Sequence, residues 1–237
     1  MKRMLSIICA FTMLFLLCSC TDNNPNKATE YVSATTSISK ESVKEFLLLL
    51  EKTVPSGHID GYKIREENCY NVTPVEVAAQ TDMKIFKLSD SCASFVMVDN
   101  EIYTICEFLG GYGFVNAVPC DFDNDGHKDL LVASSWGSGM HRSIISVFNS
   151  VTKESTVIYN TFTTDNPGID LFVAAESPVF SSKKIEDWPI YYQVYSAEIT
   201  VNDMVEYNLA DLSYVATDLV GSIEIENGKP VFKPYQN

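Results

Sequence analysis

The sequence predicts a mainly β protein of antiparallel sheets, with one α-helix near the start of the folded part. Asp99-Asn100 and Asn227-Gly228 each separate two apolar runs, and these residue types tolerate the positive φ that two-residue hairpin turns require. From Met83 onward, most runs are rich in Tyr, Phe, Val and Ile and are joined by short polar segments. Consecutive runs of this kind favour antiparallel sheets over alternating βα units.

The helix is predicted over residues 42–54, "SVKEFLLLLEKTV", where apolar residues recur at helical intervals and Pro55 ends the run. Ser42 and Glu45 have the spacing of a capping box, in which the two side chains satisfy backbone N–H groups of the first turn. Adjacent leucines widen the apolar face, so the helix is expected to pack against a sheet. A helix lying on a membrane is the alternative, although the polar face lacks the usual Lys and Arg.

The N-terminal segment has the pattern of an export signal. Lys2 and Arg3 precede an uncharged, mostly apolar run over residues 4–17, which is short for a membrane-spanning helix. A transmembrane anchor or a buried helix is the alternative interpretation. We therefore predict a signal peptide over residues 1–19, a flexible polar tether over 20–40 and a single sheet-rich domain over 41–237. The tether has few large apolar residues, so burial cannot offset its ordering entropy.

The end of this signal, "LCSC" at residues 17–20, resembles the bacterial lipobox, in which Leu stands three residues before a lipid-modified Cys. The resemblance implies that Cys20 carries the lipid and becomes the first residue of the mature chain. It also implies an anchor in a membrane of the bacterial cell envelope, outside the cytoplasm. Each buried methylene of such an anchor contributes about 0.8 kcal/mol. Cys18 is a departure, because the motif more often has Ala, Ser, Thr or Val there.

Four cysteines remain in the predicted domain: Cys69, Cys92, Cys106 and Cys120. An even number in an exported protein is compatible with two disulfides, and three pairings are open. Four reduced, buried cysteines are the alternative. The sequence contains no CxxC spacing, which argues against a zinc site or a thioredoxin-like dithiol.

The chain carries a formal net charge of −14, and loss of Lys2 and Arg3 with the signal peptide would leave about −16. Nucleic acids and anionic lipid headgroups are recognised by clusters of basic residues. The charge therefore disfavours both as partners, and a nucleic-acid-binding function is not expected.

Four aspartates stand at positions 1, 3, 5 and 9 of the segment "DFDNDGHKD": Asp121, Asp123, Asp125 and Asp129. Carboxylates this close repel one another unless a cation neutralises them. Calcium takes six to eight oxygen ligands, and Gly126 allows the sharp turn that would aim the carboxylates inward. We predict a Ca²⁺ site formed by the four aspartates and the main-chain carbonyl of His127. The alternative is a solvated acidic turn that binds no ion.

An EF-hand is excluded by context, because Val132 occupies position 12, where that motif has a bidentate Glu on a helix. The segment "DFDNDGHKDLLV", with "GGYGFVNAVPC" before it and "SIISVFN" after it, instead resembles the FG-GAP/VCBS repeat of integrin-type propeller blades. The resemblance implies a four-stranded blade over residues 114–161, with strands at 114–120, 130–134, 143–149 and 155–161. It also implies that Asp121, Asp123, Asp125, Asp129 and the His127 carbonyl bind calcium between the first two strands.

The sequence contains only one such loop. The other strands could form degenerate blades that close a propeller, or a single blade could lie within a different sheet-rich fold. We favour the second arrangement.

The loop at residues 134–143, "SSWGSGMHRS", follows the second blade strand. Trp136, His141 and Arg142 are candidate ligand contacts, because Trp and Arg are frequent in recognition hot spots. A Trp within the sheet core is the alternative. Ser and His in one loop suggest an envelope hydrolase, but the G-x-S-x-G elbow is absent. We therefore expect a binding or interaction module for a protein or glycan ligand, with the hydrolase as the alternative.

Overall fold

The computed structural model describes residues 33–59, 61–91, 93–106, 110–138, 140–161, 168–176, 191–206 and 208–235. The predicted signal peptide, the lipidation site Cys20 and Cys92 lie outside these ranges. Within them, no helix combines the length and the apolar composition that a membrane crossing requires.

The protein is mainly β, as predicted, and its described residues form three antiparallel sheets of four or five strands. The first sheet contains β4 (Cys69–Asn71), β5 (Lys84–Leu88), β6 (Ser94–Val98) and β7 (Glu101–Cys106). The central sheet contains β8 (Gly113–Cys120), β9 (Asp129–Trp136), β10 (Arg142–Phe148) and β11 (Ser155–Asn160). The outer sheet contains β1 (Ser33–Thr35), β12 (Asp170–Glu176), β13 (Tyr191–Val201), β14 (Leu212–Glu226) and β15 (Lys229–Pro234).

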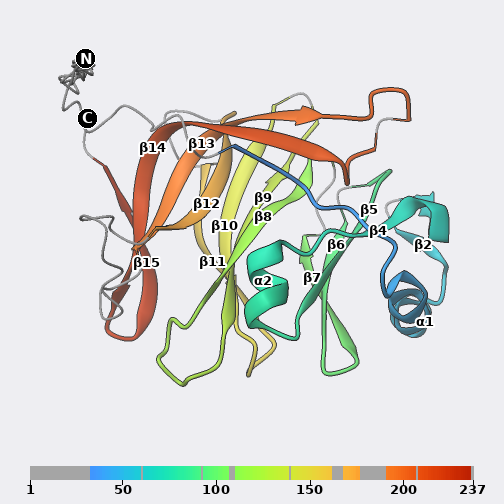
Figure 1. Ribbon diagram of the computed structural model, residues 1–237, viewed down its shortest axis with the longest axis horizontal. Helices are drawn as coiled ribbons and strands as arrows, with labels where there is room; N and C mark the ends of the chain where they lie inside the picture. Colours follow the sequence, from blue (N-terminus) through green and yellow to red (C-terminus); the bar gives the residue numbers. More distant parts are fainter. Residues whose placement is uncertain are drawn as a thin grey trace, which may run out of the picture.

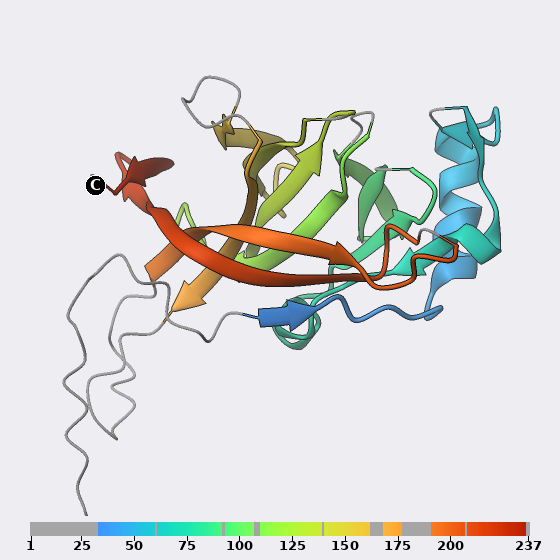
Figure 2. The ribbon, with the colours of Figure 1, turned by 90° about the horizontal axis from the view of Figure 1, so that it is seen from above.

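The smaller elements precede the first sheet or lie between its strands along the chain. They are α1 (Val43–Thr53), β2 (His58–Ile59), β3 (Tyr62–Lys63), a 3₁₀ turn (Glu66–Asn68) and α2 (Val75–Gln80). Figures 1 and 2 show α1 at one end of the molecule, followed by the first, central and outer sheets in a row.

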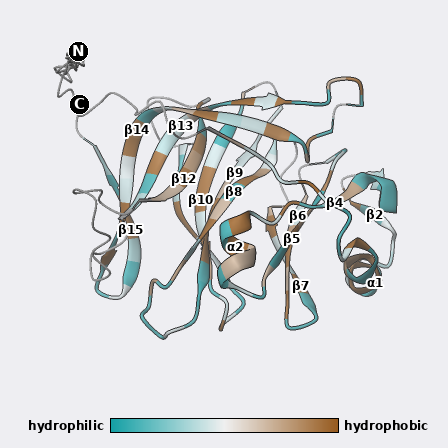
Figure 3. Cartoon of the chain, viewed as in Figure 1, coloured by the Kyte–Doolittle hydropathy of each residue, from teal (hydrophilic) through white to brown (hydrophobic). Residues whose placement is uncertain are grey.

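Strands β8, β9 and β10 of the central sheet are buried on both faces, whereas β11 is partly exposed. Leu130 and Val132 of β9 belong to the core shared with the first sheet, whereas Leu131 and Ala133 belong to the core shared with the outer sheet. A strand buried on both faces needs apolar residues at successive positions instead of an alternating pattern. This explains the uninterrupted apolar run "LLVA", and Figure 3 shows that the turns at the lower edge of the sheets are hydrophilic.

The four-stranded unit predicted over residues 114–161 is confirmed. Strands β8 to β11 form a meander in the order β11-β10-β9-β8, and each lies within a residue or two of its predicted position, except that β9 extends to Trp136. A closed propeller needs at least about four blades. The part of the chain that the structure describes provides three large sheets, stacked in a row, which agrees with the arrangement we favoured from the sequence.

Side chains replace a neighbouring strand where the central and outer sheets meet. Strand β12 is the edge of the outer sheet, and its Val173 N–H and C=O are hydrogen-bonded by the side-chain amide of Asn116, at 3.1 and 2.7 Å. The Leu171 N–H donates to the Ser143 hydroxyl at 3.1 Å. These bonds satisfy backbone groups that would otherwise be buried without partners, so they fix β12 against β8 and β10.

Helix α1 packs against the first sheet as predicted, with Phe46 stacked on Phe86 of β5 at 4.3 Å between ring centroids. The predicted capping box is wrong. Ser42 has a left-handed backbone (φ 59°) and makes no side-chain capping bond. Its hydroxyl instead accepts a hydrogen bond from the Lys84 ammonium at 2.7 Å, so a tertiary contact replaces the local one.

Residues 33–40, which the sequence placed in the tether, belong to the folded domain. Strand β1 pairs with β14, and the Thr36 N–H donates to the Leu212 carbonyl at 2.7 Å. At the other end, the Ser39 N–H donates to the Asn71 carbonyl of β4 at 2.9 Å. We call residues 33–40 the strap. Backbone hydrogen bonds order the strap, so its low apolar content wrongly indicated a flexible tether.

The structure excludes one of the two cysteine arrangements that the sequence left open. Cys69 and Cys120 are free thiols, and both are fully buried. The two-disulfide arrangement is therefore wrong. Burial raises the pKa of the Cys69 thiol to about 12 and raises the pKa of Cys120 well above its ordinary value.

Several elements were not predicted, among them the short strands β2, β3 and β4 and the 3₁₀ turn. Helix α2 has six residues, too few to show a helical period, and the first ten residues of β14, Leu212 to Gly221, were not recognised as strand. In β14 the burial changes irregularly along the strand, which pairs with β1 near its start and with β15 near its end.

Candidate metal centre

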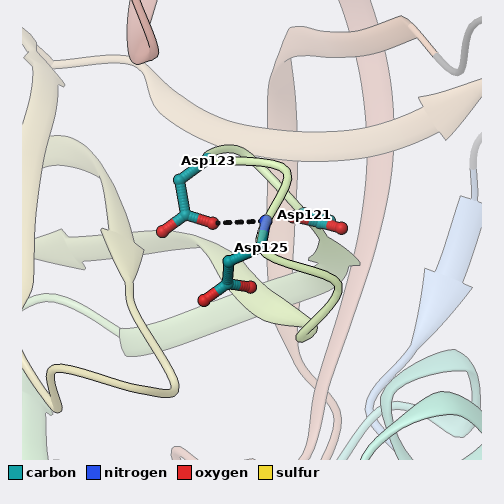
Figure 4. Close-up of side chains that lie close together, drawn as sticks. All are labelled: Asp121, Asp123 and Asp125. Atoms are coloured by element: carbon teal, nitrogen blue, oxygen red, sulfur yellow. Dashed lines mark hydrogen bonds between the residues drawn. The ribbon is translucent and has the colours of Figure 1, made fainter.

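Three of the predicted ligands lie together in the loop that joins β8 to β9. Carboxylate oxygens of Asp121, Asp123 and Asp125 lie within 4.8 Å of one another (Figure 4). The Oδ1 atom of Asp121 is buried, and no hydrogen-bond partner for it exists within the described part of the chain. A buried carboxylate oxygen without a partner is costly, and a coordinated cation is one partner that would satisfy it.

The loop holds this shape through short-range hydrogen bonds. The Asp125 N–H donates to Asp123 Oδ1 at 3.2 Å, as drawn in Figure 4, and the His127 N–H donates to Asp125 Oδ1 at 2.7 Å. Asn124 and Gly126 have positive φ values of 58° and 86°. Asn and Gly are the residues that adopt this conformation at low cost, so the local sequence itself specifies the turn.

Asn149, at the end of β10, supports the loop from outside and was not predicted. Its side-chain amide donates to Asp123 Oδ2 at 3.1 Å, and its Oδ1 accepts the N–H groups of Val151 and Thr152. An Asn before a turn is a common signal for such local bonds. Its reach to Asp123 depends on the register of β9 on β10, which the sequence does not reveal.

Asp129 lies outside the group of three carboxylates. It is 1% exposed, and its Oδ1 accepts the Ser150 N–H at 2.9 Å. Burial raises the pKa of the Asp129 carboxyl above its ordinary value. Asp129 thus ties the start of β9 to the turn between β10 and β11. Its role as a metal ligand, and that of the His127 carbonyl, stay predictions.

The residues present fit a hard divalent cation. The three grouped side chains offer only oxygen donors, and calcium accepts carboxylate, carbonyl and water oxygens in flexible geometry. The proximity of three carboxylates provides the charge that balances such an ion.

The second predicted site lies at the opposite ends of the central strands. His141 Nδ1 lies 3.4 Å from Asp170 Oδ2, and the Ser135 hydroxyl donates to Asp170 Oδ1 at 2.6 Å. The His141 ring contacts the Tyr112 ring edge-on at 4.6 Å between centroids. The guanidinium of Arg142 lies over the Trp136 ring at 5.4 Å. The structure therefore pairs Arg142 with Trp136 and places His141 against Asp170 and Tyr112.

This arrangement differs from a nucleophile–base pair. The Ser135 hydroxyl is bonded to the carboxylate of Asp170 and not to the His141 imidazole, whereas an activated serine donates to its base. Asp170 stands 29 positions from His141 in the sequence, so no local pattern indicated its participation. What the geometry supports is a histidine oriented by an aspartate.

Comparisons with known proteins find no match for this chain. No family model, no curated protein and no solved structure matches this chain.

Proposed function

We propose that this protein is a lipid-anchored bacterial envelope protein whose sheet domain is stabilised by calcium and acts as a binding module. The observation that carries the calcium proposal is the group of three carboxylates in the β8–β9 loop, with the buried and unpartnered Asp121 Oδ1 beside it. The anchor is supported by the resemblance of "LCSC" to a lipobox, in which Cys20 would be the lipidated residue.

The binding function is supported by where the loop lies. The β8–β9 loop joins two strands of the central sheet, whose faces hold both large cores. A cation that draws Asp121, Asp123 and Asp125 together would order the start of β9 and the neighbouring turns. A surface held in one conformation binds with a smaller ordering cost, so a metal-braced turn region is well suited to recognition.

Calorimetry of the full chain tests the metal. We expect Ca²⁺ to bind and to raise the melting temperature, with a stabilisation of about 2.7 kcal/mol when the ion is present at one hundred times its dissociation constant. Asp123→Asn should abolish both effects. Glu51→Gln, which removes an exposed acid on α1, is the charge-matched control and should bind Ca²⁺ normally. Absence of binding heat together with an unchanged melting temperature would refute the metal role.

The second candidate is an envelope hydrolase, and the observation that favours it is the orientation of His141 by Asp170. An imidazole whose Nδ1 faces a carboxylate can act as a general base through its other nitrogen. If this function is correct, His141→Gln abolishes hydrolysis of a screened panel of esters and amides while the melting temperature stays unchanged. Retained hydrolysis in that variant would assign the activity elsewhere.

A further inference from the structure

A polar pocket of about 300 Å³ lies beside the metal loop, and nothing above accounts for it. Three turns and the end of α2 surround it: the β6–β7 turn, the β8–β9 loop, the β10–β11 turn and residues 80–83. Figure 1 shows these three turns at the lower edge of the first and central sheets. A volume at the lower end of the range for ligand pockets suits one small molecule and not an extended polymer.

The cations of this pocket lie deeper than its anions. Lys128 is half-buried, and the Lys153 side chain is 21% exposed. Asp99, the ion-pair partner of Lys153, is 72% exposed, and Asp82 is also exposed. A solvated carboxylate at the rim gains little from its ion pair and is screened by salt. The lining therefore holds two partly buried lysines, one of them paired with Asp99, against two exposed carboxylates, although the chain as a whole carries a charge of −14.

The remaining lining offers hydrogen bonds. Gln80, Thr81 and Ser150 contribute amide and hydroxyl groups, and His127 contributes an imidazole. Lysine ammonium groups bind carboxylates through charge-assisted hydrogen bonds, and neutral polar groups bind hydroxyls. We propose that this pocket binds a small hydroxylated carboxylate of the sugar-acid type, with its carboxylate between Lys128 and Lys153.

The pocket shares a wall with the metal loop, which couples the two sites. Gly126, His127 and Lys128 line the pocket and directly follow Asp125 in the chain. Without a cation, three neighbouring carboxylates repel an anionic ligand. A bound divalent ion removes two of those three negative charges, so the ligand should bind more tightly in its presence, and the coupling is reciprocal. This second part of the proposal rests on the calcium site proposed above.

The test is titration calorimetry of the full chain with D-glucuronate, and with D-glucose as the uncharged probe of the same ring. Each titration is run with Ca²⁺ and in buffer stripped of metal by ion-exchange resin, because common chelators are themselves carboxylates. Titration of glucuronate into calcium buffer without protein corrects for direct binding of the ion. Lys128→Gln and Lys153→Gln remove one ammonium each. Lys229→Gln, at the exposed start of β15, is the matched control.

We expect glucuronate to bind, glucose to bind at least tenfold more weakly, and each pocket variant to lose about tenfold in affinity while Lys229→Gln loses none. Melting temperatures of all three variants establish that they are folded. Failure of glucuronate to bind a chain that does bind Ca²⁺ overturns the pocket and leaves the calcium proposal standing. Equal affinities with and without Ca²⁺ overturn the coupling alone. Equal affinities for glucuronate and glucose overturn the assignment of the carboxylate to the two lysines.

Discussion

Lys40, the last residue of the strap, contacts Cys69 of the first sheet. The Lys40 ammonium donates to the carbonyl oxygens of Glu66, Glu67 and Cys69 at 2.7 to 2.9 Å and lies 3.6 Å from the centre of the Tyr70 ring. Partial burial lowers the pKa of Lys40. Carbonyl dipoles and an aromatic face stabilise the cation there, so one lysine holds the strap to the first sheet.

The buried Cys69 thiol predicts a loss of stability at alkaline pH. Burial raises its pKa from 9.0 to about 12. Above pH 9 the unfolded chain therefore releases a proton that the folded chain keeps, and the free energy of unfolding falls as the pH rises. For this group alone the loss is about 1.4 kcal/mol between pH 8 and pH 10. Urea unfolding at the two pH values measures it.

Cys69→Ala isolates this contribution. The substitution also leaves a small void, but that cost is the same at both pH values and cancels in the difference. Tyrosines with raised pKa values, such as Tyr214, act in the same direction above pH 10 in both proteins. The variant should therefore lose less stability than the parent chain between pH 8 and pH 10. An identical loss would show that the Cys69 thiol ionises as freely in the folded chain as in the unfolded one.

At the scale of elements, the connection from β7 to β8 crosses close to the end of β9. Gly110 forms a parallel bridge with Gly137, and a Cβ atom on Gly111 would lie 2.4 Å from the Trp136 Cα. Real Cβ atoms do not approach backbone so closely, so the crossing requires glycine. The crossing also positions the backbone at Trp136, whose ring contacts the Arg142 guanidinium.

Gly111→Ala and Gly228→Ala form a matched pair that separates crowding from backbone strain. Both glycines have φ of +72°, but the Cβ of Gly228 would meet no described heavy atom within 4 Å. Gly228→Ala should lower the free energy of unfolding by about 1–2 kcal/mol, the cost of the left-handed conformation alone. Gly111→Ala should lower the free energy of unfolding by at least about 2 kcal/mol more than Gly228→Ala does, because β9 must move to make room for the new Cβ atom. Chemical denaturation checks both, and equal costs would mean that the crossing relaxes easily.

At the scale of the whole molecule, the strap joins the two ends of the sheet stack. Its β1 pairs with β14 of the outer sheet, and its Ser39 bonds to Asn71 of the first sheet (Figure 2). The central sheet lies between them. The strap therefore limits separation of the sheets, in addition to the packing of the two cores.

Truncation tests the strap. A chain that begins at Ser33 keeps the strap, whereas one that begins at Glu41 loses β1, the Thr36 and Ser39 bonds and Lys40. We expect the shorter chain to be less stable by about 3 kcal/mol or more, since each lost hydrogen bond contributes about 1 kcal/mol. We also expect its urea transition to broaden as the sheets unfold less cooperatively. Equal stability of the two chains would make residues 33–40 a tether after all.

The sequence by itself determined the features that depend on neighbouring residues. The Asp99-Asn100 and Asn227-Gly228 turns adopt the positive φ that their residue types favour, and the β8–β11 meander and the turn at Gly126 formed where predicted. Asp121, Asp123 and Asp125 lie together because they stand at alternate positions of one tight loop. These features are local, so short-range sterics and hydrogen bonds specify them.

Only the tertiary structure decided which distant groups meet. Asp129 is buried against Ser150, and Asp170 lies beside His141. The Ser42 hydroxyl accepts a hydrogen bond from Lys84, and the strap lies across the sheets. Each of these contacts depends on strand pairing or sheet stacking over long sequence separations. Their stability comes from burial and from hydrogen bonds that exist once the sheets have assembled, and no local pattern of residues encodes that assembly.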